Sequence, residues 1–288
     1  MVPMGTNLAS ERVGQFFVGD DRLEYTEFGS GLRWVVLLHG QLMPRRMHEP
    51  LARMLAAAGL HVVTLDLLGH GRSDRPEDPK EYSMTAWGEQ VVALLDHLGA
   101  EHAVVGGTSL GANVSLEVAV LEPDRVQGLL LEMPVLDNAV EAGIIAFAPL
   151  LFLSRFFPPS IRLMAAGSRL VPRRLAPFWG QVVLDTLDQR PRSMAAVIHG
   201  IFFGRVAPSS KQRRAIDVPA MVVGHSHDPI HPAADAAMLA DELPWAEFVQ
   251  ARSILEWRVR PERLDDLAVA FVDRCWGGPV SAGQRREG

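Results

Sequence analysis

The chain has 288 residues, of which 48% are apolar, enough to bury the core of one large domain or two small ones. Its net charge of −6 argues against nucleic acid as a partner. Its single cysteine, Cys275, excludes an intramolecular disulfide and a metal cluster built on cysteine and histidine.

No targeting or membrane-spanning segment is predicted. Residues 1–14 lack the basic, then apolar, then small pattern of a signal peptide. The longest apolar run, residues 142–153, is shorter than the ~20 residues that cross a bilayer. We therefore expect a cytoplasmic protein without an integral membrane segment, and the oligomeric state stays open.

The first predicted elements form a β-hairpin, because residues 13–18 and 22–28 alternate in polarity around Gly19-Asp20-Asp21. Later runs that are short and continuously apolar are typical of strands buried on both faces, namely residues 34–38, 61–65, 102–106, 126–131, 220–224 and 246–249. Apolar residues at three- and four-residue spacing predict helices between them, at residues 49–58, 84–98, 110–121, 233–243 and 261–275. The alternation predicts an α/β fold with a doubly wound, mostly parallel sheet. Ligands bind such sheets at the carboxyl ends of the strands.

The alternation breaks between residues 137 and 215. This stretch is helical in pattern, and residues 137–214 carry a net charge of +7, which leaves −13 on the remainder. We predict a helical cap at 137–215, inserted into a core of residues 1–136 and 216–276, and a disordered tail at 277–288. Most cap aromatics are expected in the lid core and some in the pocket, namely Phe147, Phe152, Phe156, Phe157, Phe178, Trp179, Phe202 and Phe203. The cap arginines either attract an anionic amphiphile or a membrane surface, or form a solvated basic face.

The central motif is Gly107-Thr108-Ser109-Leu110-Gly111, which follows a predicted strand and opens a predicted helix. In that context G-x-S-x-G predicts a tight turn that raises the Ser109 hydroxyl above the sheet edge, with Gly107 and Gly111 providing space. The Leu110 backbone N–H is left at a helix N-terminus, where it can donate to an oxyanion. Ser109 is the candidate nucleophile, and the alternative is a chance match in a glycine-rich chain.

Three further segments make residues 13–275 resemble the α/β-hydrolase superfamily. Residues 37–41 (Leu-Leu-His-Gly-Gln) resemble its oxyanion loop, residues 66–74 its D-x-x-G-x-G-x-S turn, and residues 228–232 (Asp-Pro-Ile-His-Pro) its acid loop. The resemblance implies a capped serine hydrolase in which Gln41 and Leu110 N–H groups hold the oxyanion and Asp228 is the triad acid. An alternative role for Asp228 is a helix cap.

Other motif residues have structural interpretations. His39, Asp66 and His70 are expected to stabilise loops and turns, and Cys275 to be a core residue. Ser109 at the elbow argues against an enzyme with an aspartate nucleophile, such as an epoxide or haloalkane hydrolase. The resemblance implies no cofactor, and a C–C bond hydrolase or a cofactor-free oxidative enzyme remains open.

The histidine of the family pattern is missing. In the superfamily it follows the last strand, and anchoring the alignment on Pro261-Glu262 places Ile254 at its position. No histidine follows His231, and a serine hydroxyl is a poor nucleophile without a base. Another histidine has taken over, or the protein binds a ligand or partner without hydrolysis, or it catalyses a cyclisation or elimination. The histidines to consider are His39, His225, His227 and His231.

His231 is the best candidate base, because it lies three residues after Asp228 at a position that usually faces the pocket in the family pattern. The alternative is an exposed ring at a helix N-terminus. We expect His225 and His227 to lie behind the strand end or in solvent. The sequence thus predicts hydrolysis of an apolar or amphipathic small-molecule ester, or a related acyl or C–C bond, by Ser109, Asp228 and His231. The alternative is a non-hydrolytic member of the fold.

Overall fold

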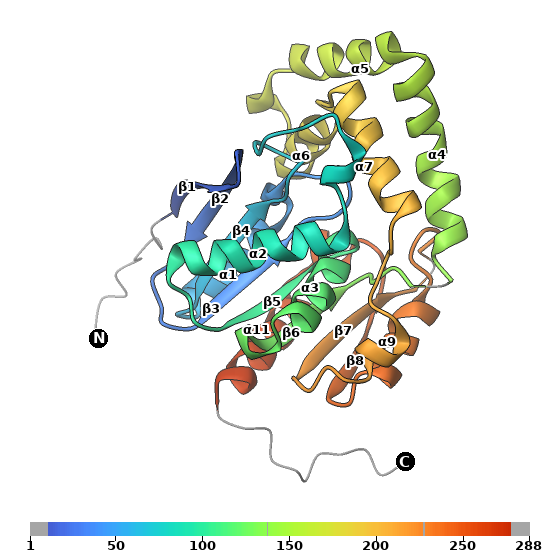
Figure 1. The fold of residues 1–288 in the computed structure, drawn as a ribbon. Helices are drawn as coiled ribbons and strands as arrows, with labels where there is room; N and C mark the ends of the chain where they lie inside the picture. The colour runs from blue at the N-terminus through green and yellow to red at the C-terminus, as the bar shows by residue number, and fades with distance from the viewer. Residues whose placement is uncertain (1–10, 137, 227, 278–288) are drawn as a thin grey trace.

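A computed structural model describes residues 11–136, 138–226 and 228–277 (Figure 1). Its strands form one sheet in the order β1-β2-β4-β3-β5-β6-β7-β8. The hairpin strands β1 and β2 run antiparallel to their neighbours, and all other pairs are parallel. The strands are β1 (Glu11–Val18), β2 (Asp21–Phe28), β3 (Trp34–Leu38), β4 (His61–Asp66), β5 (Ala103–Thr108), β6 (Val126–Glu132), β7 (Ala220–His225) and β8 (Ala246–Ala251). The predicted α/β fold is confirmed.

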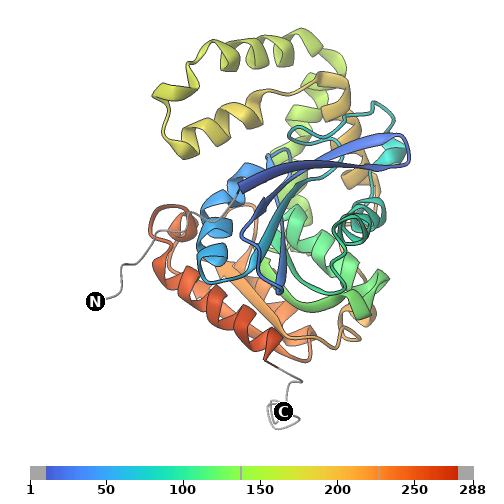
Figure 2. The ribbon, with the colours of Figure 1, turned by 90° about the vertical axis from the view of Figure 1, so that its left-hand side faces the viewer.

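Helices cover both faces of the sheet (Figure 2). Alternate residues of one strand enter different cores, so Val36 packs with one helix layer and Val35 with the other. The first layer contains α2 (Met84–Leu98), α3 (Leu110–Leu121) and α9 (Ala233–Glu242), and the second contains α1 (Glu49–Ala57) and α11 (Glu262–Trp276). The sheet is therefore buried on both sides, which explains its continuously apolar strands.

Local signals set the helix ends. Ser83 caps α2 by accepting a hydrogen bond from the Ala86 N–H, and Gly99 ends this helix at φ 67°. The short elements are η1 (Arg45–His48), η2 (Pro79–Glu81), η3 (Pro123–Arg125), η4 (Arg173–Leu175), α8 (Ser210–Arg213) and α10 (Glu256–Val259).

A helical insertion separates β6 from β7 and lies over the carboxyl edge of the sheet (Figure 1). It contains α4 (Val140–Phe156), α5 (Pro158–Leu170), α6 (Phe178–Leu187) and α7 (Pro191–Phe203). Prolines begin α5 and α7, where a missing N–H costs no helical hydrogen bond. The boundary between cap and core stays a prediction, and the predicted tail falls, apart from Gly277, outside the described residues.

The prediction that most cap aromatics lie in the lid core is wrong, because half of these side chains are exposed. Phe147, Phe178, Trp179 and Phe202 are partly buried. The other four are exposed, namely Phe152, Phe156, Phe157 and Phe203. Two of these lie on α4, which packs on α5 and α7 but is uncovered on its outer side.

Within the described ranges no single helix has the length and hydropathy to cross a membrane. The segments Glu141–Phe156 and Pro158–Leu170 pass that test only as a pair bent by 106°.

Candidate active site

Ser109 lies on a strained turn between β5 and α3. Its φ of 55° and ψ of −110° are rarely adopted outside glycine, and its backbone N–H donates to the Glu132 carbonyl oxygen at 2.9 Å. A Cβ at Gly107 would lie 2.2 Å from the Leu38 carbonyl oxygen, and one at Gly111 would lie 2.0 Å from it. Only glycine fits at these two positions, because the elbow presses directly on β3.

The structure brings His231 to Ser109. Its Nε2 lies 2.9 Å from the Ser109 Oγ, and its Nδ1 lies 3.0 Å from the Asp228 Oδ2. A carboxylate can only accept, so Nδ1 carries the proton and Nε2 accepts from the Ser109 hydroxyl. The His231 side chain is 15% exposed, so it is not the solvent-exposed ring of the alternative interpretation. The distance is within the range of about 2.6–3.2 Å that a general base needs.

A tight turn after β7 holds the acid and the imidazole together. The Asp228 Oδ1 accepts from the backbone N–H of Ile230 at 2.8 Å and of His231 at 3.0 Å, which leaves Oδ2 for the ring. Burial alone raises the pKa of Asp228, but hydrogen bonds from the His231 ring and the two backbone groups outweigh it and lower that pKa. The carboxylate is therefore ionised at neutral pH.

Gln41 and Leu110 lie beside Ser109 in the wall of one cavity. Leu110 begins α3, so its N–H has no partner within the helix and is free to bind an anion. The Gln41 Oε1 is buried and has no hydrogen-bond partner among the described residues. The wall near the nucleophile thus offers one donor from the helix end and one unused acceptor.

This cavity is apolar and has a volume of about 100 Å³. The amide of Asn113 faces it but is occupied by the backbone of Val135 and Val206. Its described walls include no arginine or lysine, and they are formed by Gln41, Met84, Ser109, Leu110, Asn113, Val135, Ala139, Gly143, Ile144, Phe147, Ile201, Phe202, Val206, Ile230 and His231. Residues of α4 and α7 close it over the sheet edge, so the insertion completes the pocket.

The other motif residues form hydrogen bonds that stabilise loops and turns. The His39 Nδ1 donates to the Gly40 carbonyl oxygen at 2.9 Å, and its Nε2 accepts from the Leu67 N–H at 3.1 Å. Asp66 accepts from a backbone N–H later in its turn, and His70 bonds to a carbonyl oxygen two residues before it. Burial lowers the pKa of both histidines, so these rings are neutral. His39 has no ring nitrogen left for Ser109.

His225 also bonds elsewhere. Its Nε2 lies 3.1 Å from the Glu132 Oε1 and its Nδ1 2.9 Å from the Ser253 carbonyl oxygen. His227 lies outside the described residues. Ile254, at the family's histidine position, is 39% exposed and does not line the cavity.

The sequence reasoning missed a buried cluster around Glu132, behind the elbow. The Glu132 Oε2 accepts from the Thr108 hydroxyl at 2.5 Å and from the Arg258 guanidinium at 2.6 Å, and Oε1 faces the ring of His225. Burial raises the pKa of Glu132, but Arg258 and His225 hold it far below its usual range. A glutamate at the end of the apolar run 126–131 was the available signal, because a buried charge needs a partner.

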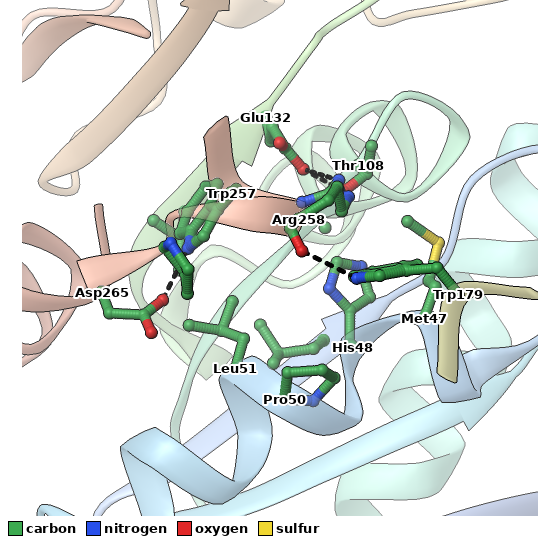
Figure 3. Close-up of a pocket in the computed structure, with 14 residues that line it drawn as sticks. Met47, His48, Pro50, Leu51, Thr108, Glu132, Trp179, Trp257, Arg258 and Asp265 are labelled. Carbon is green, nitrogen blue, oxygen red and sulfur yellow. Dashed lines mark hydrogen bonds and ion pairs between the residues drawn. The ribbon is translucent and has the colours of Figure 1, made fainter. Parts of the chain in front are cut away.

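A second, smaller cavity adjoins this cluster (Figure 3). Its volume is about 20 Å³, room for about one water molecule. Trp179 donates to the Arg258 carbonyl oxygen and Trp257 to Asp265, each at 2.8 Å, so both indoles are satisfied within the wall. No group of three or more His, Cys, Asp or Glu side chains in the described part of the chain is placed to hold a metal ion. The cavity beside Ser109 is the candidate active site.

Comparisons with known proteins agree with the fold described above. A family model described as alpha/beta hydrolase fold matches residues 33–252. A haloalkane dehalogenase of Mycolicibacterium paratuberculosis is 29% identical over 46% of this chain and 45% of the relative. Epoxide hydrolase A of Mycobacterium tuberculosis is 38% identical over 41% of this chain and 37% of the relative. The aligned part of this chain thus spans less than half the length of these two curated relatives.

Among solved structures, an enol-lactonase from Burkholderia xenovorans LB400 superposes with a TM-score of 0.74 at 21% identity, over 90% of this chain and 99% of that one. At this level of identity the likeness shows the fold.

Proposed function

This chain belongs to the α/β-hydrolase fold family, and we propose that it is a serine hydrolase acting on an apolar small-molecule ester, or a related acyl or C–C bond. The observation that carries the proposal is the 2.9 Å contact between the Ser109 Oγ and the His231 Nε2. It supplies the base that the family position, Ile254, lacks.

In the proposed mechanism, the Ser109 hydroxyl gives its proton to the His231 Nε2 as the oxygen attacks the substrate carbonyl carbon. The backbone N–H groups of Leu110 and Gln41 stabilise the resulting oxyanion. The C–O bond to the leaving group then breaks, and that group takes the proton from His231. Water attacks the acyl-serine, with His231 again accepting and returning the proton, and the carboxylic acid leaves.

Asp228 orients and stabilises His231 in this mechanism. Its bond to Nδ1 fixes the tautomer in which Nε2 is free to accept. Its lowered pKa keeps a negative charge beside the imidazolium that forms in each half-reaction.

The walls of the cavity favour an uncharged acyl chain. Apart from His231 they carry no ionisable side chain among the described lining residues, so a substrate carboxylate would lose its hydration without gaining a cationic partner. The unused Gln41 Oε1 suits a substrate hydroxyl or amide donor.

The haloalkanes and epoxides in the relatives' names fit less well. Attack by Ser109 on either substrate would leave an ether, which this site has no means to cleave, whereas attack on an ester leaves an acyl-serine that water can hydrolyse. The non-hydrolytic alternative rests on the lack of a histidine at the family position, and the contact of His231 with Ser109 supports hydrolysis over it.

The test is labelling of the purified protein with a fluorophosphonate probe, followed by turnover of short p-nitrophenyl esters. Ser109→Ala should abolish both signals, and His231→Ala should slow labelling and turnover severely. Ser253→Ala, which removes an exposed hydroxyl, should react like the wild type. Wild-type protein that neither labels nor turns over would refute the proposal.

A further inference from the structure

The outer face of α4 and α5 is apolar and uncovered. On α4, exposed side chains recur at the spacing of one helical stripe, and α5 continues the pattern while its opposite side is buried. The apolar members define the docking face, namely Ile145, Phe152, Phe156, Phe157, Leu163 and Leu170. Exposed apolar residues gathered in this way mark an interaction surface rather than ordinary surface variation.

Aromatic rings concentrate where the two helices meet. The ring of Phe152 lies 5.0 Å from that of Phe156 and 5.9 Å from that of Phe157, between centroids. The helices diverge there by 106°, and the corner lies at the outer margin of the molecule, away from the sheet (Figures 1 and 2). The rings are therefore accessible to a broad, flat surface.

The charges on this part of the insertion are positive and partly unpaired. Arg155, Arg162 and Arg174 are exposed, and none forms an ion pair with a described residue. In contrast, Arg169 and Arg173 bond to aspartates of the insertion. The only acidic residue between positions 140 and 175 is Glu141, at the far end of α4.

We propose that the docking face binds the surface of an anionic lipid bilayer. The aromatic and aliphatic side chains enter the boundary between headgroups and acyl chains, and the unpaired arginines bind the lipid phosphates. The +7 charge of residues 137–214 against −13 on the remainder turns the insertion toward such a surface and the rest of the protein away from it.

Two other arrangements fit the observations less well. A second copy of the same face would bring Arg155, Arg162 and Arg174 of both protomers into one interface, with Glu141 as the only acidic residue between positions 140 and 175 to pair them. A transmembrane arrangement conflicts with the sharp bend, because neither helix is long enough alone. An interfacial position satisfies both constraints.

The docked orientation also places the cavity near lipid. Ile144 and Phe147 of α4 line the cavity wall, while Ile145 of the same helix belongs to the docking face. If the proposed ester hydrolysis holds, an amphipathic substrate can pass from the bilayer to Ser109 along this helix. The docking itself does not depend on that activity.

The test is co-sedimentation of the full chain with phosphatidylcholine vesicles, with and without phosphatidylglycerol, at low and high salt. Phe156→Ser/Phe157→Ser removes the aromatic corner, and Arg155→Gln/Arg162→Gln removes two unpaired charges. Phe17→Ser is the control for the loss of an exposed phenylalanine, because Phe17 lies outside the insertion and Phe17 and Phe156 are each 66% exposed.

The charge control is Arg72→Gln/Arg252→Gln, which removes two exposed arginines outside the insertion. We expect the wild type to bind the anionic vesicles. In the arginine variant this binding should fall roughly 30-fold, because each of the two arginines removed contributes about 1 kcal/mol at an anionic surface. The phenylalanine variant should lose at least ~10-fold, and both controls should bind like the wild type. Thermal unfolding of each variant verifies its fold independently of any catalysis.

Three results would overturn the proposal. The first is equal binding to neutral and anionic vesicles, or none to either. The second is the same loss of binding in the controls as in the docking-face variants. The third is a dimer in sedimentation equilibrium that Phe156→Ser/Phe157→Ser dissociates, which would assign the face to a second copy.

Discussion

Replacing Asp228 by asparagine tests how the acid loop controls His231. The Asp228 Oδ1 accepts from two backbone N–H groups, at 2.8 and 3.0 Å, and Oδ2 faces the His231 Nδ1 at 3.0 Å. An asparagine must keep its oxygen toward the two backbone donors, so its NH₂ takes the place of Oδ2. That NH₂ donates to Nδ1, which forces the ring proton onto Nε2, against the Ser109 hydroxyl. The base then has no lone pair directed at the nucleophile.

We expect kcat for p-nitrophenyl ester hydrolysis to fall roughly 10⁴-fold in Asp228→Asn. KM should change little, because the apolar wall is untouched. Asp228→Ala should lose the activity and also stability, since two backbone N–H groups lose their acceptor at a cost of about 1 kcal/mol each. Asp266→Asn, on the exposed side of α11, is the matched control. If Asp228→Asn retained activity within about tenfold of the wild type, the proposed tautomer control would be wrong.

Three further changes address the fold and the pocket. Burial alone lowers the pKa of His225, but its bond to Glu132 outweighs this and raises it. The ion pair therefore stabilises the fold below about pH 6.5 and is lost as pH rises through the folded pKa. Thermal midpoints should consequently fall more steeply from neutral to alkaline pH in the wild type than in His225→Gln, and parallel curves would contradict this. Gly111→Ala places a Cβ 2.0 Å from the Leu38 carbonyl oxygen, so this variant should unfold at a clearly lower urea concentration than the wild type. An unchanged urea midpoint would show that the backbone of the elbow can shift to accommodate the methyl group. Phe147→Ala enlarges the cavity wall, so kcat/KM should shift toward longer acyl chains across an ester series, and an unshifted profile would place the acyl chain elsewhere.

The arrangement of strands and helices was predictable because burial on both faces leaves a strong local pattern. The run at residues 34–38 coincides with β3, and the periodic segments 84–98 and 110–121 coincide with α2 and α3. Strand ends were less predictable. β6 and β7 each extend by one polar residue, Glu132 and His225, because Glu132 still pairs with Val223 and His225 with Ala251 in the sheet. The side chains of Glu132 and His225 also bind each other across the two strands, which satisfies both groups where they are buried. That pairing is invisible in either segment alone.

The sequence pattern also could not show that the outer face of the insertion is exposed. Helical periodicity in Phe152 and Phe156 is the same whether a stripe packs on a neighbour or faces outward. Only the packing of α4 against α7 on its other side shows that these rings remain uncovered.

The sequence by itself determined the elbow and the acid turn, because both depend on short-range geometry. Gly107 and Gly111 leave room for the close approach of the Ser109 turn to β3, and an aspartate side chain can bind backbone N–H groups two and three residues ahead. Only the tertiary structure decided which histidine meets the serine. Ser109 and His231 are 122 residues apart, and they meet because β5 and β7 end at the same edge of the sheet, on either side of β6. Local chemistry set what each loop can do, whereas the order of the strands decided which loops are neighbours.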